Sequence, residues 1–297
     1  MKQNSHPNLF ILGAPKSGTT ALANNLTQCE KIFLPIKKEP RFFDAETFYD
    51  YEEDYPIKDI TEYLKLYKNT GDYKYRIDAS VFNMYSKNSI NAILKLSPDA
   101  KFIVILREPV DASVSMHKQR LKYLDSKMRE VSERFMDCWN LIDKRKQGAG
   151  YPRNCRNQFL FRYDLLFSYE KYLPYIINTI PEDNLRIVDY SFYKNSPNDF
   201  YKEIFDFLDI DIITIKNNTV NDSGIVQNKL YKKFIFKLAC FFRTKLKFVK
   251  FSKKFKMKIK SILFSTSSSS SLDSSVDEKV IEFFSQTNEY LKQLNMK

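Results

Sequence analysis

The sequence predicts an α/β fold in which a parallel sheet is flanked by helices on both faces. Short apolar runs at residues 9–12, 101–106 and 185–190 alternate with segments of helical periodicity. Strands that alternate with helices are typical of parallel sheets, because each crossover helix returns the chain to the same end of the sheet. With 297 residues, 43% of them hydrophobic, the chain is long enough to bury a large core.

Each predicted element depends on a local signal. Strands are expected at residues 9–12, 31–34, 75–80, 101–106 and 185–190, where apolar residues cluster. Helices are expected at residues 20–29, 60–67, 89–96, 109–121, 125–147, 163–180, 199–208 and 277–294, where apolar residues recur at helical spacing. Pro109 suits the first turn of its helix, because its missing N–H would be unpaired there. Gly71 and the Gly148–Gly150 segment mark breaks between elements.

The first strand runs into a loop that precedes the first helix and reads Gly13-Ala14-Pro15-Lys16-Ser17-Gly18-Thr19-Thr20. A strand that turns sharply into a helix places several unpaired backbone N–H groups around one point. The helix dipole adds partial positive charge there, and Lys16 adds a full charge. The loop therefore predicts a site for phosphate or a similar anion. The alternative is a joint that needs glycine only for its backbone angles.

The predicted sheet also indicates where other site residues gather. Ligands of such sheets bind beyond the carboxyl ends of the strands. This rule places the 13–20 loop, the charged 35–44 loop, residues 78–80 and Arg107 around one cleft.

The 13–20 loop departs from the pattern of ATP-binding P-loops, in which a lysine directly follows the second glycine. Gly13 and Gly18 have the required spacing, but Thr19 stands in the lysine position. The strand that would supply a magnesium-binding aspartate ends at Arg107, a cation. These departures favour an anion site without a metal, and a nucleotide kinase or NTPase remains the alternative.

Three segments resemble motifs of sulfotransferases that use 3′-phosphoadenosine 5′-phosphosulfate (PAPS). Residues 15–20, Pro-Lys-Ser-Gly-Thr-Thr, resemble the loop that binds the 5′-phosphosulfate. Residues 106–115, Leu-Arg-Glu-Pro-Val-Asp-Ala-Ser-Val-Ser, are similar to the family's 3′-phosphate motif. Residues 38–44, Lys-Glu-Pro-Arg-Phe-Phe-Asp, resemble a segment of the carbohydrate-sulfating branch, which holds heparan-sulfate-type and bacterial enzymes. The resemblance extends over residues 8–210.

The resemblance implies a P-loop-kinase-like sulfotransferase fold, PAPS as co-substrate and PAP as product, with no metal. It implies that the donor contacts Pro15, Lys16, Ser17, Gly18, Thr19, Thr20, Arg107 and Ser115. Lys16 would stabilise the leaving oxygen, and Glu39 would act as the base toward the acceptor. The expected acceptor is a hydroxyl or amine of a carbohydrate or glycolipid.

The proposed site residues also have ordinary structural interpretations. Arg107 suits a surface ion pair, Ser115 a plain helix position, and Glu39 a solvated charge in a basic loop. Asp78 is a second candidate base, with a structural role at its strand end as the alternative. For the whole chain, a non-catalytic module that binds PAP or another anion at a membrane is a further alternative.

Histidine and cysteine usage argues against metal and disulfide chemistry. The chain has two histidines, His6 and His117, and its four cysteines form no C-x-x-C pair. We expect free thiols, although a disulfide between Cys138 and Cys155 is compatible with the sequence.

Basic charge is concentrated in the C-terminal third. Residues 229–260 hold 13 of the 48 Lys and Arg residues, and no acidic residue lies between 224 and 272. Interleaved apolar residues suit residues 229–262 to peripheral contact with an anionic membrane or an acidic glycan. The alternative is one or two helices that cover the core with a solvated basic face. We expect no nucleic-acid partner, because no recognition motif accompanies the charge.

We therefore divide the chain into a PAPS-binding core at 1–222, a basic segment with a Ser-rich link at 223–272, and a C-terminal helix at 273–297 that packs on the core. The residues expected to dock that helix are Val280, Ile281, Phe284, Tyr290, Leu291 and Leu294. The first strand begins almost at once, and no apolar run reaches 18 residues. We expect a cytoplasmic protein, with peripheral attachment to a membrane left open.

Overall fold

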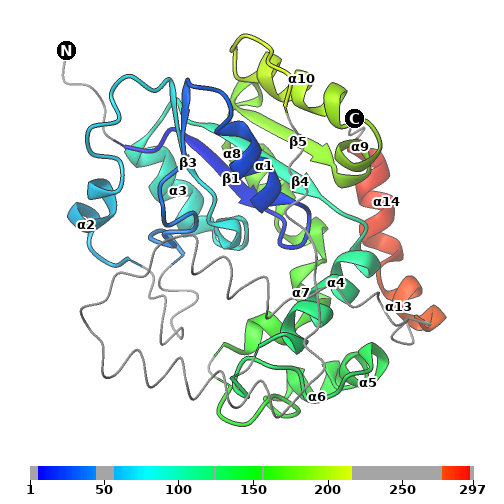
Figure 1. Cartoon of the computed structure of the whole chain (residues 1–297). Coiled ribbons are helices and arrows are strands. Elements are labelled where there is room, and N and C mark those ends of the chain that lie inside the picture. The colour runs from blue at the N-terminus through cyan, green and yellow to red at the C-terminus, as the bar shows by residue number, and fades with distance from the viewer. Residues whose placement is uncertain (1–5, 45–56, 124, 156, 216–275, 295–297) are drawn as a thin grey trace, which may run out of the picture.

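A five-stranded parallel sheet forms the centre of the protein (Figure 1). The computed structural model describes residues 6–44, 57–123, 125–155, 157–215 and 276–294. The strands are β1 (Leu9–Gly13), β2 (Ile32–Phe33), β3 (Tyr75–Asp78), β4 (Lys101–Leu106) and β5 (Leu185–Asp189). Their order is β2-β3-β1-β4-β5, and every pairing is parallel.

The strand order creates a topological switch point beside β1. The chain places β2 and β3 on one side of β1 and then crosses to place β4 and β5 on the other side. Crossover connections leave the sheet in opposite directions there, so a crevice opens at the carboxyl ends of β1 and β4. The loops that follow β1 and β4 are the two that carry Lys16 and Arg107.

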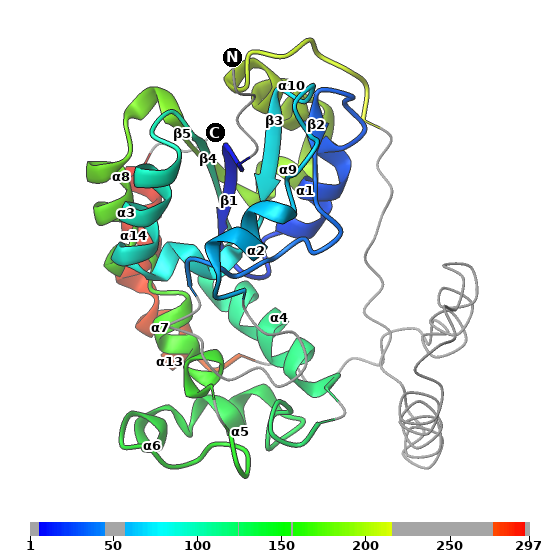
Figure 2. The same ribbon diagram turned by 90° about the vertical axis from the view of Figure 1, so that its left-hand side faces the viewer.

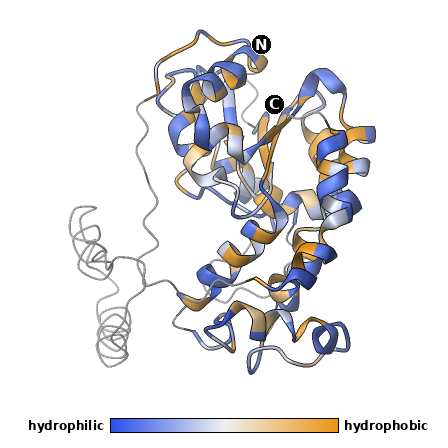
Figure 3. Cartoon of the chain, turned by 90° about the vertical axis from the view of Figure 1, so that its right-hand side faces the viewer, coloured by the Kyte–Doolittle hydropathy of each residue, from blue (hydrophilic) through white to orange (hydrophobic). Residues whose placement is uncertain are grey.

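Helices cover both faces of the sheet, as the sequence predicts (Figure 2). One face packs against α1 (Thr19–Leu26), α9 (Tyr190–Asn195) and α10 (Pro197–Phe207). The other face packs against α3 (Lys87–Leu96), α8 (Leu173–Thr179) and α14 (Ser285–Gln293). The hydropathy colouring in Figure 3 shows hydrophobic residues concentrated on strands in the middle of the molecule.

The apolar runs of the strands serve both layers, because successive side chains of a strand point to opposite faces. In β1, Leu9 and Ile11 belong to the core on the α1 face, while Phe10 and Leu12 belong to the opposite core. All four side chains are fully buried. A continuous apolar run is therefore what a strand between two helical layers requires.

The remaining described elements complete the chain. They are α2 (Ile60–Lys65), α4 (Pro109–Leu121), α5 (Phe135–Trp139), α6 (Ile142–Lys146), α7 (Tyr163–Leu166) and α13 (Glu278–Phe283), with short 3-10 turns η1 (Val81–Tyr85), η2 (Gln158–Phe161), η3 (Tyr169–Lys171) and η4 (Glu182–Asn184). Pro109 occupies the first turn of α4, as predicted, and the Glu108 carboxylate accepts from the Asp111 N–H at 2.6 Å. This cap begins α4 directly after the end of β4.

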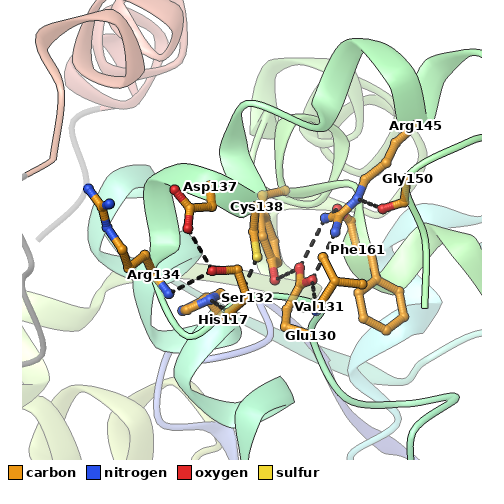
Figure 4. Close-up of polar contacts among 11 residues, drawn as sticks. His117, Glu130, Val131, Ser132, Arg134, Asp137, Cys138, Arg145, Gly150 and Phe161 are labelled. Atoms are coloured by element: carbon orange, nitrogen blue, oxygen red, sulfur yellow. Dashed lines mark hydrogen bonds and ion pairs between the residues drawn. The ribbon is translucent and has the colours of Figure 1, made fainter.

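Three predicted helices are wrong in extent. Residues 125–147 form turns followed by α5 and α6, because Glu130 is drawn into the core by a buried ion pair with Arg145 (Figure 4). Residues 163–180 are divided among α7, η3 and α8. The C-terminal helix is divided at Phe284, and Ile281, one of its predicted docking residues, is 53% exposed.

The described C-terminal helices contribute to the main core. Val280 and Phe284 are fully buried in the same cluster as Phe10 and Phe102 of the sheet. Residues 216–275, which include the basic 229–262 segment and all of the 223–272 region, lie outside the described residues. No helix within the described ranges is both long enough and apolar enough to span a membrane.

Candidate active site

The loop after β1 depends on two glycines for different reasons. A Cβ on Gly13 would overlap the Met84 sulfur, because η1 packs directly against the end of β1. Gly18 has φ +80°, a left-handed conformation that glycine adopts without strain, and caps the N-terminus of α1. A Cβ there would lie 3.1 Å from the Tyr190 ring. The loop is thus held tightly between η1 and α9.

The N-terminus of α1 is open to an anion. Among the described residues no side chain caps it, and its first turn carries no acidic residue. Unpaired N–H groups of a first turn and the helix dipole both favour negative charge. Ser17 is fully buried, and among the described residues its Oγ interacts only with the Tyr169 hydroxyl, without the geometry of a full hydrogen bond. A buried hydroxyl with so weak a contact fits a ligand oxygen at this position.

Lys16 lies in this loop, close to other cations. Its backbone is left-handed, with φ +70°. Burial lowers the pKa of Lys16 to about 8, and the charges of Lys122, Arg107 and Arg120 contribute in the same direction. The site therefore concentrates positive charge around one amine, as a polyanionic ligand requires.

Arg107 follows β4 and contacts the Lys16 loop directly. Its Nη1 donates to the Lys16 carbonyl oxygen at 3.3 Å, and its guanidinium lies 5.1 Å from the centre of the Tyr190 ring. Its Nη2 pairs with Asp111 at 3.4 Å, which is the ion pair that the structural interpretation of this residue predicts. Arg107 Nε is buried and has no partner among the described residues, so the fork has a donor left for a ligand.

Tyr169 supports this arginine from η3. Its buried hydroxyl donates to the Arg107 carbonyl oxygen at 3.1 Å. Ser115 lies on α4, half-buried, beyond the first helical turns. The neighbouring Ser113 is fully buried and donates to the Pro109 carbonyl oxygen at 2.7 Å, so its hydroxyl is already engaged within the helix.

The 35–44 loop is hydrogen-bonded to the residues that directly follow β3. The Ala79 N–H donates to the Lys38 carbonyl oxygen at 3.3 Å, and the Arg41 N–H donates to Ser80 Oγ at 3.0 Å. Phe42 stacks on Tyr63 of α2 with ring centres 4.6 Å apart. These contacts place the loop at the carboxyl edge of the sheet, where the sequence predicts it.

Glu39 in this loop forms an ion pair with Lys38 at 2.6 Å, and about a third of its side chain is exposed. Two buried carboxylates, Asp44 and Asp78, lie close enough to Glu39 to interact with its charge. Burial raises the pKa of Asp44 to about 6, and the charges of Asp78 and Glu39 add to the effect against the opposing Arg41. Glu39 is therefore the accessible member of a group of three carboxylates.

Asp78, the second candidate base, is engaged in structure. It is 1% exposed and accepts from the Tyr63 hydroxyl at 2.6 Å and the Ser80 N–H at 2.8 Å. Burial raises its pKa above the ordinary value. These contacts support the strand-end structural role instead of general-base catalysis.

His117 and three of the four cysteines can be assessed for metal and disulfide chemistry. His117 is 3% exposed, and its Nε2 lies 3.1 Å from the Ser132 carbonyl oxygen (Figure 4). Cys29, Cys138 and Cys155 are free, so the Cys138–Cys155 disulfide does not form. Within the described ranges no group of three or more His, Cys, Asp or Glu residues could hold a metal ion.

Sequence reasoning missed four residues around the loop. Tyr190 and Tyr169 pack against Arg107, and Arg120 and Lys122 act on the charge of Lys16. Tyr190 follows β5 directly, so the rule that ligands bind beyond the carboxyl ends of strands would have found it. Nothing in the sequence distinguishes Arg120 from an ordinary basic residue at a helix C-terminus.

A parallel sheet with a glycine-containing loop that leads into a helix after β1, and with an arginine after β4, is typical of α/β proteins that bind phosphorylated ligands at a switch point. The family comparison specifies the class further. The sulfotransferase domain matches residues 6–284, so the chain belongs to the sulfotransferase family of enzymes.

Similar proteins agree with this family. The membrane-associated sulfotransferase kil1 of Dictyostelium discoideum is 28% identical over 118 residues, which are 40% of this chain and 24% of that protein. The chain thus matches about a quarter of that relative's length.

Two solved structures share the fold. A sulfotransferase from Alicyclobacillus acidocaldarius has a TM-score of 0.60 at 22% identity, over 78% of this chain and 91% of that one. Mouse sulfotransferase SULT7A1, complexed with PAP, has a TM-score of 0.50 at 16% identity, over 98% of this chain and 88% of that one. At these identities the likeness concerns the fold.

Proposed function

We propose that this protein transfers the sulfuryl group of PAPS to a hydroxyl or amine of a carbohydrate or glycolipid. The observation that carries the proposal is the direct contact between Arg107 and the Lys16 loop, at 3.3 Å. It joins the two predicted phosphate motifs across the switch point, and family membership supplies the reaction class.

The donor would lie along the loop after β1. The first-turn N–H groups of α1 and the hydroxyls of Ser17, Thr19 and Thr20 would bind the 5′-phosphosulfate. Arg107, with Ser115 farther along α4, would bind the 3′-phosphate through its planar fork. Arg107 Nε supports these assignments, because it is a buried donor that lacks a partner among the described residues.

The transfer step needs a base and a stabilised leaving group. The acceptor oxygen forms a bond to sulfur while the bond from sulfur to the bridging oxygen of the 5′-phosphate breaks. The acceptor proton moves to the Glu39 carboxylate, and PAP leaves with the bridging oxygen. Lys16 donates to that oxygen as negative charge develops on it, and electrostatic stabilisation of this kind is a large part of such catalysis.

The carbohydrate acceptor is supported by the 38–44 segment. Its resemblance to the carbohydrate-sulfating branch includes Glu39, and the backbone contacts to β3 hold Glu39 at the carboxyl edge. A kinase or NTPase is less well supported, because Thr19 replaces the P-loop lysine and Arg107 replaces the magnesium-binding aspartate.

Donor binding is tested by calorimetry with PAP and with ATP. We expect PAP to bind more tightly, and Arg107→Ala to weaken PAP binding about tenfold or more through the lost charge-assisted hydrogen bonds. The exposed Arg134→Ala variant is the matched control and should bind PAP normally. Tighter binding of ATP, or unchanged PAP affinity in Arg107→Ala, would contradict the assignment.

The reaction is tested by transfer of labelled sulfate from PAPS to a panel of glycans and glycolipids. Glu39→Gln should lower kcat by about 10²–10⁴-fold without changing PAP affinity, because it removes the base and retains the shape. Glu62→Gln, a change at an exposed glutamate of α2, is the control. Full activity of Glu39→Gln would remove Glu39 as the base, and the absence of transfer to any acceptor would favour a non-catalytic PAP-binding module.

We further propose a cytoplasmic location with peripheral membrane contact through residues 229–262. The support is the basic and apolar sequence of that segment. Sedimentation of the full chain with anionic and with zwitterionic vesicles tests this proposal. Binding to anionic vesicles that weakens with salt is expected, and equal or no binding to the two would overturn it.

A further inference from the structure

Tyr169 of η3 lies at the junction of the two loops that carry Lys16 and Arg107. It is fully buried, and its hydroxyl donates to the Arg107 carbonyl oxygen at 3.1 Å. That bond uses the one hydrogen of the phenol, so the phenol oxygen can still accept. Ser17 of the loop after β1 interacts with it there, although without the geometry of a full hydrogen bond. A single hydroxyl therefore contacts both loops.

The direct contact between the two loops is weaker than this connection. Arg107 Nη1 donates to the Lys16 carbonyl oxygen at 3.3 Å, which is longer than the usual N–H···O distance of about 2.9–3.0 Å. Tyr169 instead belongs to the main hydrophobic cluster, where close packing leaves a side chain little freedom. Tyr169 is therefore the more rigid of the two connections between the loops.

The C-terminal helix α14 holds the turn that carries Tyr169. The Thr287 hydroxyl donates to the Glu170 carboxylate at 2.7 Å, and Thr287 is 1% exposed. A hydrogen bond to a charged acceptor is stronger than one between neutral groups. The two residues are 117 positions apart in the sequence, so the bond joins distant segments. A path of contacts thus runs from α14 through η3 to both loops.

We propose that Tyr169 is a positioning residue that holds the loop after β1 and Arg107 at the spacing of the donor's two phosphates, with support from α14. This inference rests on the proposed function, since it presumes that one nucleotide bridges the two loops. Two phosphates of one molecule bind best to sites that are already at the right separation, because binding then loses less conformational entropy. Removing the Tyr169 hydroxyl should therefore weaken a bridging ligand more than a ligand that occupies one loop.

The first test compares PAP, 5′-AMP and adenosine 3′-phosphate by calorimetry. PAP carries both phosphates, and each monophosphate carries one. Tyr169→Phe should weaken PAP binding about five- to tenfold and each monophosphate under about twofold. The control is Tyr175→Phe, which removes a hydroxyl that donates to Asn91 at 2.8 Å and should leave all three affinities unchanged. Unchanged PAP affinity in Tyr169→Phe, or equal weakening of PAP and 5′-AMP, would overturn the proposal.

A double-mutant cycle tests whether Tyr169 acts through Arg107. In the Arg107→Ala background the guanidinium that would bind the 3′-phosphate is absent, so the spacing of the loops no longer matters for PAP. Tyr169→Phe should then change PAP affinity by under about twofold, because residues that act through one another are not additive. A full-sized effect of Tyr169→Phe in that background would show an independent role and contradict the proposal.

The support from α14 is tested by Thr287→Val, which keeps the shape of the side chain and removes its hydroxyl. PAP affinity should fall about threefold. Glu170→Gln should retain most of the affinity, because its amide oxygen still accepts from Thr287. The control is Ser285→Ala, since the Ser285 hydroxyl bonds within its own segment to the Glu282 carbonyl oxygen at 2.7 Å. Unchanged PAP affinity in Thr287→Val would overturn the role given to α14.

These binding measurements need no turnover, so they separate this inference from the proposed function. A wild-type protein that transfers sulfate from PAPS, with the same PAP affinity in Tyr169→Phe, would contradict the role of Tyr169 alone. A wild-type protein that binds PAP without transferring sulfate would contradict the proposed function. The relative losses of PAP and 5′-AMP affinity in Tyr169→Phe would still decide the role of Tyr169 in that case.

Discussion

At the scale of single residues, Lys16 combines an unusual backbone with an unusual charge environment. Its amine is drawn into a site where burial and three neighbouring cations lower the pKa to about 8, well below the ordinary value for lysine. Near this pH a large fraction of the free protein has a neutral Lys16. An incoming phosphate favours the charged amine, so ligand binding and proton binding are linked.

We therefore predict that PAP binding takes up a proton at pH 8.5. Its affinity should fall as the pH rises past about 8, by up to about tenfold per pH unit for one linked proton. Calorimetry in two buffers of different ionisation enthalpy measures the uptake. Lys16→Met should bind PAP weakly and without proton uptake, and Lys122→Met should move the affinity decrease to higher pH. Binding of PAP by the wild type with no proton uptake would contradict this account.

Residues with a local pattern could be predicted, and residues defined by burial could not. Lys16, Gly18 and Arg107 stand in loops whose position after a strand is visible in the sequence, and the structure brings these loops together. Arg120 becomes distinctive only through its 3% exposure and through two donors that lack a partner among the described residues. Those properties arise from packing between distant segments, which periodicity does not report.

At the scale of elements, the 125–147 segment shows tertiary contacts overriding helical periodicity. Arg145 and Glu130 are both fully buried and pair at 2.8 Å (Figure 4). The Tyr163 hydroxyl donates to the same carboxylate at 2.5 Å. Burial alone would raise the pKa of Glu130, but its bonds to Arg145 and Tyr163 outweigh burial and lower it. The pair therefore favours turns over a helix at residues 125–134, because it holds Glu130 against Arg145 of α6.

We predict that Arg145→Met destabilises the protein by about 3–5 kcal/mol, because it leaves Glu130 buried without a counter-ion. The double variant with Glu130→Met should be more stable than Arg145→Met alone, since it removes the stranded charge. Lys146→Met, which removes an exposed ion pair with Asp143, should cost under about 1 kcal/mol. Urea unfolding at pH 7 measures all three, and a double variant less stable than Arg145→Met would argue against this explanation.

The same pair has a pH signature. The folded-state pKa of Glu130 lies below its unfolded value, so its stabilising contribution is present above about pH 4.5 and is lost as the pH falls through the folded-state pKa. The free energy of unfolding should therefore decline more steeply below about pH 4.5 in the wild type than in the double variant. Equal slopes in urea unfolding across that range would contradict the assignment.

At the scale of the whole molecule, the sheet could be predicted and the cover of one face could not. Alternating strands and helices require a parallel sheet with helices on both sides, and the carboxyl-edge rule then locates the site. The C-terminal helices return from the far end of the sequence to the face of α3 and α8 (Figure 2). Amphipathicity predicts that such a helix docks, but it does not specify the face or the break at Phe284.

Phe284 anchors the C-terminal helices on the main core. Phe284 is fully buried against Trp139, with ring centres 5.6 Å apart, and the Thr287 hydroxyl donates to Glu170 at 2.7 Å. Phe284→Ala should cost about 3–5 kcal/mol, because it empties a filled site in the main core. Ile281→Ala in the neighbouring α13 should cost under about 0.5 kcal/mol, since Ile281 is 53% exposed.

Trp139 is the single tryptophan of the chain, so its fluorescence reports on this contact while circular dichroism reports on the whole fold. If the C-terminal helices and the sheet form one cooperative unit, fluorescence and circular dichroism will give the same urea midpoint as each other within each protein. This should hold for the wild type, for Ile281→Ala and for Phe284→Ala, although the midpoint itself differs between the proteins. A fluorescence transition that precedes the loss of circular dichroism would show instead that the C-terminal helices detach first. The sheet and the loop after β1 would then be stable without them.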